Sequence, residues 1–176
     1  MPSIGKRAWV AAATVLLPLA AVMGRSQADS SPQSIVEKYC SLDAQGANFS
    51  ASNPNAKALW ALLINEDEAG HDESVITRSY HIGKSKVAGT SADIEVTYDD
   101  LGTLAGNSAK KNPHSETVVF HLTKEANAWK IDGLRILPHI SQTWILSNLR
   151  HSLSADEKAG KSDPRLKSAF DQISQW

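Results

Sequence analysis

The feature that most constrains the fold is a change in hydrophobic period midway along the chain. Between residues 34 and 46 the apolar residues recur at the spacing of one helical face. Between residues 93 and 99 they alternate strictly, so that Ile94, Val96 and Tyr98 share one face of a strand. Since the two periods place apolar side chains on different faces, the chain is expected to combine early helices with a central sheet.

The order of the expected elements indicates the fold class. Helices are expected over 34–46 and from Asn53-Pro54, and later ones from about Ser141 and from Asp163-Pro164. Strands are expected over 74–82, 93–99, 116–123 and 128–137, with a bulge at Gly102 and a polar loop over 106–115. Clustered strands after paired helices predict an α+β fold, in which helices pack on an antiparallel sheet. A doubly wound fold would need alternating helices and strands, which this order lacks.

The first helix shows both a start signal and a buried stripe. Ser34 is placed to cap it, with Glu37 completing a capping box, and Gly46 is a natural stop. Cys40 falls on the apolar stripe, so we interpret it as a buried small hydrophobic residue rather than a reactive thiol.

The first 28 residues have the pattern of a signal peptide. Lys6 and Arg7 precede an uncharged run over 8–23, and Ser26-Gln27-Ala28 supplies the small residues that signal peptidase needs. The alternative is an uncleaved membrane anchor. The run has 16 residues and contains Pro18, which makes it short for the roughly 20 residues that a membrane span needs. We therefore expect export, to a periplasm or to the outside, with cleavage after Ala28.

Charge and cysteine content exclude several classes of protein. Cleavage would remove Lys6, Arg7 and Arg25 but no acid, leaving 15 basic and 19 acidic residues and a net charge of −4. A mildly acidic exported chain is not expected to bind nucleic acid, and no stable membrane span is expected after cleavage. One cysteine excludes an internal disulfide framework.

No motif in the sequence indicates a metal or a cofactor. The acid-rich stretch 66–73 lacks the acid spacing of a calcium-binding EF-hand loop, and we interpret it as a solvated turn. The six histidines are scattered, without the H-E-x-x-H spacing of a zinc enzyme. There is no G-x-S-x-G elbow and no glycine-rich phosphate loop.

Four stretches resemble the nuclear transport factor two-like group, also called the cystatin-like cone. They are SIVEKYCSLDAQGA over 34–47, IEVTYDDLG over 94–102, ETVVFHL over 116–122 and WKIDGL over 129–134. The chain is most similar to small exported bacterial domains of unknown function. The resemblance implies a curved antiparallel sheet forming a cone, with N-terminal helices packed on it and a C-terminal helical tail outside it.

The resemblance leaves the activity open, because this fold hosts isomerases, dehydratases, ligand binders and association modules. Isomerase members use a pocket tyrosine and a pair of strand aspartates, and no such pair is recognised in this sequence. Asp93, Glu95 and Asp99 lie opposite the apolar face of their strand, so no catalytic residue is carried over.

We expect a noncatalytic binding or association module that holds a small apolar ligand or a protein partner. The alternative is an isomerase- or dehydratase-type enzyme with acid–base residues in the cone pocket. A homodimer through the open sheet face is a further expected arrangement. The candidate pocket residues are aromatic: Trp60, Tyr80, Tyr98, Phe120, Trp129 and Trp144.

The expected organisation has three parts. Residues 1–28 form the signal peptide, 29–151 the α+β domain, and 152–176 a polar tail with an amphipathic helix. We expect the apolar stripe of that helix, which includes Leu166, Ala169 and Ile173, to pack on its own domain. Docking to a partner or to a membrane surface is the alternative.

Overall fold

The computed structural model describes residues 30–65, 71–132 and 136–176. The expected signal peptide with its cleavage site at Ala28, and residues 66–70 of the acid-rich stretch, lie outside the described residues. The elements in chain order are α1 (Pro32–Asp43), α2 (Ala56–Trp60), β1 (Glu73–Ala88), β2 (Ser91–Ala105), β3 (Ser108–Glu125), β4 (Ala128–Asp132), β5 (His139–Ser141), α3 (Gln142–Lys158) and α4 (Pro164–Ile173).

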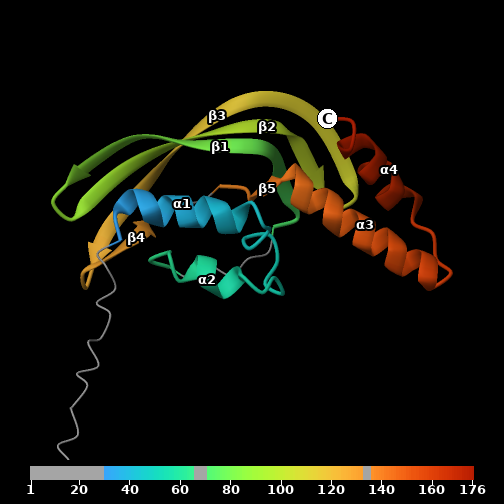
Figure 1. The fold of residues 1–176 in the computed structure, drawn as a ribbon, viewed down its shortest axis with the longest axis horizontal. Helices are drawn as coiled ribbons and strands as arrows, with labels where there is room; N and C mark the ends of the chain where they lie inside the picture. The colour runs from blue at the N-terminus through green and yellow to red at the C-terminus, as the bar shows by residue number, and fades with distance from the viewer. Residues whose placement is uncertain (1–29, 66–70, 133–135) are drawn as a thin grey trace, which may run out of the picture.

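One curled sheet organises the molecule. Its strand order is β4-β3-β2-β1-β5, and every pair is antiparallel except β1 with β5. Figure 1 shows the long strands β1, β2 and β3 arching over α1, with α2 below that helix and α3 and α4 at one end of the arch. The expected α+β class, with a curved antiparallel sheet and helices packed on it, is confirmed.

The polar loop expected over 106–115 is wrong, because most of this segment belongs to β3. Residues 108–115 pair with the far end of β2, including Asp100 with His114 and Gly102 with Lys111. Pro113 is accommodated because it falls at the register shift opposite Leu101, where no regular ladder hydrogen bond is required. The bulge expected near Gly102 is confirmed at this same place.

Two helix starts differ from expectation. The cap of α1 is Ser31 rather than Ser34: its side-chain oxygen accepts from the Ser34 N–H at 3.1 Å. Pro32 takes the first turn, where a missing N–H costs nothing. The second helix begins at Ala56 rather than at Asn53-Pro54, and it is short, because it ends at Trp60. The starts of α3 after Ser141 and of α4 after Asp163 are confirmed.

Buried apolar side chains form two separate cores. The first is between α1 and the sheet and includes Val36, Tyr39, Ile94 and Phe120. Cys40 is buried there, as its place on the stripe predicts.

The second core joins the C-terminal helices to the far ends of β1 and β2. It includes Ile76, Leu101, Leu104, Ile145, Leu149, Leu166, Ala169 and Ile173. The expectation that the stripe of α4 packs on its own domain is therefore confirmed. Helix α3 continues to Lys158 and so crosses the expected boundary at residues 151–152. In the described part of the chain, no helix combines the length and the apolar character needed to cross a membrane.

Candidate functional site

The six aromatic candidates do not converge on one pocket. Tyr98 and Phe120 are fully buried in the first core, and Trp60, Tyr80 and Trp129 pack against its edge. Trp144 belongs to the second core. Tyr39 and Phe120 meet edge to face, with ring centroids 5.4 Å apart, so the space under the arch is filled by side chains of the protein itself.

An open groove of about 510 Å³ lies beside Trp144, between α3 and the segment 49–54. Its apolar lining residues are Phe49, Pro54, Leu104, Trp144, Ile145, Leu149 and Leu166. The polar ones are serines and asparagines, and no charged side chain is among the described lining residues. A second groove, beside Trp129, differs in being flanked by Lys38 and Lys130.

A cluster of polar side chains is buried where α1, β2 and β5 meet. We call it the buried polar cluster; its members are Cys40, Asp43, Tyr98, Asp100 and His139. Each is at most 2% exposed. Buried polar groups normally have hydrogen-bond partners, because losing water without replacement is costly. Several atoms of this cluster have none among the described residues, which sets it apart from the two cores.

Asp43 connects the end of α1 to the start of β5. Its Oδ2 accepts a hydrogen bond from the backbone N–H of His139 at 2.9 Å, while its Oδ1 has no hydrogen-bond partner in the described part of the chain. Burial raises the pKa of Asp43 to about 8, and the hydrogen bond from His139 opposes the rise. The neutral form also suits the C-terminal end of a helix, where a negative charge is unfavourable.

Tyr98 and His139 lie face to face within the cluster. Their rings are stacked with centroids 3.9 Å apart and an angle of 22°. The Tyr98 hydroxyl lies 3.3 Å from the Cys40 Sγ, at hydrogen-bond distance. Burial raises the pKa of Cys40 to about 12 and lowers the pKa of His139, so both side chains are held neutral.

Asp100 marks the edge of the cluster, where two side chains of β3 meet it. Both of its carboxylate oxygens are buried without a hydrogen-bond partner in the described residues. The His114 Nε2 lies 3.7 Å from its Oδ2, and the Glu116 Oε2 lies 3.8 Å from the His139 Nε2. Burial raises the pKa of Asp100 to about 6, an effect that His114 opposes and Glu116 adds to.

The expectation that no pair of strand acids faces the same side is wrong. Asp100 and Glu116 lie on neighbouring strands and, with His114, bring one ligand atom each within 4.8 Å of one another. The alternation Tyr98-Asp99-Asp100 already placed Asp100 on the inner face. Glu116 falls within the strand expected over 116–123, whereas His114 falls in the segment expected to be a loop, so its position beside Asp100 does not follow from the sequence pattern.

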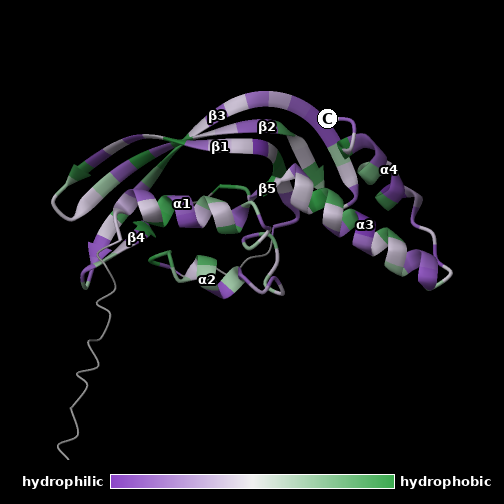
Figure 2. Ribbon diagram, in the orientation of Figure 1, coloured by the Kyte–Doolittle hydropathy of each residue, from purple (hydrophilic) through white to green (hydrophobic). Residues whose placement is uncertain are grey.

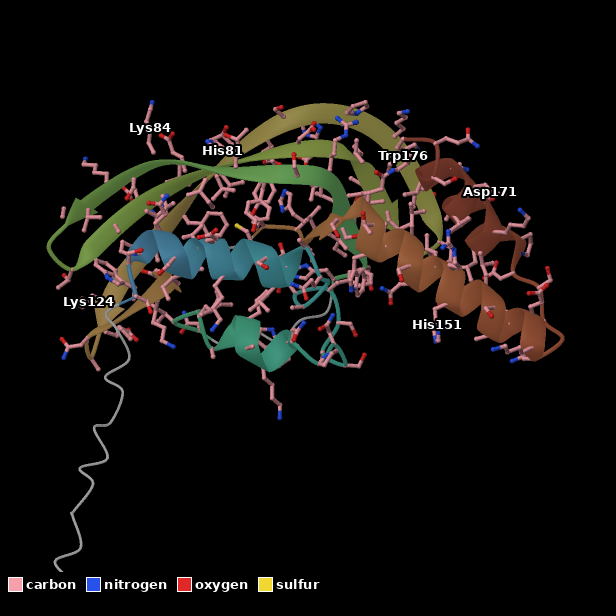
Figure 3. All side chains as sticks on the ribbon, viewed as in Figure 1. His81, Lys84, Lys124, His151, Asp171 and Trp176 are labelled. Carbon is pink, nitrogen blue, oxygen red and sulfur yellow. The ribbon has the colours of Figure 1, made fainter. Side chains whose placement is uncertain are left out.

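The outer face of the sheet carries the acids that the sequence placed there. Asp99 pairs with Arg78 at 3.0 Å, and Asp93 pairs with His121 at 2.7 Å. Figure 3 shows His81 and Lys84 rising from this outer side of the arch, and Figure 2 shows mostly polar residues over its top. Self-association through this face stays a prediction that light scattering would test.

Comparison with known proteins adds a likeness of fold. No family model and no curated protein matches the sequence. The structure is similar to the intermembrane space region of the chloroplast protein ARC6, at 16% identity over 60% of this chain and 93% of that one, with a TM-score of 0.39. It is also similar to the Ntf2-like potential transfer protein TraM of the Gram-positive conjugative plasmid pIP501, at 12% identity over 60% and 94%, with a TM-score of 0.37. TraM bears the name of the fold group that the sequence resembles, and neither protein lends this chain a function.

Proposed function

We propose that this protein is an exported, noncatalytic binding module that holds a small uncharged apolar molecule in the groove beside Trp144. The observation that carries the proposal is the contrast between a filled arch and an open, uncharged groove. A ligand cannot enter the space under the arch without displacing Tyr39, Tyr98 or Phe120, each of which is at most 2% exposed. The groove requires no such displacement.

The chemistry of the groove favours an apolar occupant. Its volume of about 510 Å³ lies within the range of roughly 300–1,000 Å³ that small-molecule sites occupy. Trp144 and Phe49 offer large apolar surfaces, while the serine and asparagine side chains supply a few neutral hydrogen-bonding groups. A charged ligand would lose its hydration there without gaining an opposite charge.

The uncharged fluorescent probe N-phenyl-1-naphthylamine tests the proposal. We expect saturable binding of one probe per mature chain, seen as increased probe fluorescence. Asn148 is exposed on α3 and lines the groove, so Asn148→Phe should fill it and weaken binding at least tenfold.

Ser147 provides the matched control, because it is exposed on the same helix and is absent from the described lining of the groove. Ser147→Phe adds the same ring elsewhere and should leave the affinity unchanged within twofold. Absence of saturable binding, or equal affinity in the two variants, would refute the assignment of this groove.

The raised pKa values of Asp43 and Asp100 favour acid–base catalysis as a second candidate function. Against it, the side chains of the buried polar cluster are almost completely shielded from solvent. A substrate would have to open the arch to reach Asp43, and an opened arch would expose the Cys40 thiol to reagents. Reactivity of that thiol therefore separates the two candidates.

Export is the part of the proposal that rests on the sequence alone. Lys6, Arg7, the uncharged run 8–23 and the small residues before Ala28 support it. Expression of the full chain in a bacterial host, followed by intact mass measurement of the exported fraction, tests it. A chain beginning at Asp29 is expected, and a product that retains Met1 would contradict cleavage.

A further inference from the structure

Asp100 and His114 form a cross-strand pair in which two electron-pair donors face each other. They are register partners of β2 and β3, and the His114 Nε2 lies 3.7 Å from the Asp100 Oδ2. The Asp100 side chain is 0% exposed, and neither of its oxygens has a hydrogen-bond partner among the described residues. A buried carboxylate without donors is relieved either by protonation or by a cation bound beside it.

The orientation of His114 identifies which of its nitrogens is free to bind. Its Nδ1 lies 2.9 Å from the backbone oxygen of Asn112. A carbonyl oxygen can only accept, so in the neutral ring Nδ1 carries the proton and Nε2 presents its lone pair toward Asp100. This is the arrangement in which histidine ligands are fixed by a second hydrogen bond to a backbone carbonyl.

Glu116 supplies the third donor from the same strand. It lies two residues after His114, so both side chains project from the same face of β3. One ligand atom from each of Asp100, His114 and Glu116 lies within 4.8 Å of the others. The His114 and Glu116 side chains are 49% and 48% exposed, so an ion reaches the site from solvent although Asp100 is buried.

We propose that Asp100, His114 and Glu116 form a binding site for a divalent first-row transition ion, with Zn²⁺ as the ion that this donor set suits best. One imidazole and two carboxylates are a mixed nitrogen–oxygen set, which zinc accepts in sites of three protein ligands and one open position. The imidazole makes the set a poor one for Ca²⁺ or Mg²⁺, which prefer oxygen ligands alone.

The spacing of His114 and Asp100 requires only a small closure, whereas Glu116, which lies within 4.8 Å of them, has up to about 1.5 Å to close. Ligand atoms at roughly 2.0–2.1 Å from a tetrahedral ion lie about 3.3 Å apart. The 3.7 Å between His114 and Asp100 is wider by a few tenths of an ångström. His114 and Glu116 are half-exposed and can turn, whereas Asp100 is held in the interior and sets the position of the ion.

The site lies apart from the groove beside Trp144, since none of its three ligands lines that groove. Its test is therefore independent of the proposed function. The mature chain, purified without a histidine tag and stripped with a chelator, is titrated with ZnCl₂ in a calorimeter. Binding of one ion per chain is expected, together with a rise in melting temperature, since an ion that binds only the folded state stabilises it.

Cobalt provides a second readout of the same site. CoCl₂ added to the stripped protein should give visible absorption bands of a low-coordinate Co²⁺ site, and ZnCl₂ should abolish them by displacement. His114→Gln and Glu116→Gln should each weaken zinc binding at least about 100-fold, beyond the roughly 10–100-fold effect of losing a residue that only orients a ligand. Asp100→Asn keeps the buried shape and should also lose the ion.

Asp93 and His121 provide a matched control, because they form a second histidine–aspartate pair across the same two strands. Their contact of 2.7 Å lies on the outer face, with side chains 50% and 68% exposed. His121→Gln should bind zinc as the unsubstituted chain does. Absence of zinc binding, binding unaffected by His114→Gln in a variant with native circular dichroism, or equal loss in His121→Gln would each overturn the proposal.

Discussion

The carboxylate of Asp43, at the end of α1, accepts a 2.9 Å hydrogen bond from the backbone N–H of His139, the first residue of β5. The two residues are 96 positions apart, so the bond fixes the N-terminal helix to the last strand. Because the carboxyl is fully buried, its pKa rises to about 8 and the neutral form is favoured in the folded protein. Ionisation of this carboxyl therefore makes the stability of the fold depend on pH.

We expect the free energy of unfolding to fall as pH rises from 6.5 to 8. In this window Asp43 is protonated when folded and ionised when unfolded, where its pKa is about 3.9, so the folded state binds the extra proton. The slope is about 1.4 kcal/mol per pH unit, or roughly 2 kcal/mol over the window. Asp100 and His139 titrate mainly below this pH window.

Urea denaturation at three pH values measures this slope. Asp43→Asn should flatten it, because asparagine keeps an acceptor for His139 and does not ionise. Asp171, half-exposed on α4 and labelled in Figure 3, serves as the control: Asp171→Asn should leave the slope intact. A flat profile in the unsubstituted protein would show that Asp43 is not held neutral.

Cys40 should resist thiol reagents in the folded protein. It is 1% exposed, and burial raises its pKa to about 12. At pH 8 the reactive thiolate is then rarer by about three orders of magnitude than in an exposed cysteine with a pKa near 8.5. We expect labelling by a disulfide reagent to be at least 1,000-fold slower than in urea. Native labelling within tenfold of the unfolded rate would favour an arch that opens and, with it, the enzymatic candidate.

Gly46→Ala should destabilise the protein by more than the cost of placing an alanine in a left-handed backbone conformation. Gly46 has φ +73°, and a Cβ there would lie 2.5 Å from the Trp144 ring. Gly89 also has a positive φ, +60°, but nothing lies within 4 Å of the site of its Cβ. Gly89→Ala should therefore cost only the roughly 1–2 kcal/mol of left-handed backbone. Gly46→Ala should cost more and shift the tryptophan fluorescence; equal losses in thermal melts would contradict the contact.

Helix α4 should contribute to the stability of the whole domain. Ile173 is fully buried in the second core, so Ile173→Ala should cost about 2–5 kcal/mol. Gln172 is exposed next to it, and Gln172→Ala should change stability by less than about 0.5 kcal/mol. Thermal and urea melts compare the two. A small effect of Ile173→Ala would instead identify α4 as a separate tail.

Much of the fold is readable from short segments of sequence. The inward face of Ile94, Val96 and Tyr98, the burial of Cys40 and the start of α4 at Asp163 follow from periodicity and capping, which act within a few residues. The extent of β3 could not be read in this way. Its residues 108–115 are mostly polar and contain Pro113, and they are strand because β2 pairs with them across a bulge.

Local patterns of residues, then, determined the class of fold and the faces of most of its elements. The tertiary structure decided which polar and ionisable side chains lie next to one another. His114 meets Asp100 because β2 and β3 pair in one register, and Asp43 meets His139 because β5 pairs with β1 beside the end of α1. Such contacts depend on pairing between segments that are distant in the chain, and no pattern within either segment specifies its partner or the register of the pairing.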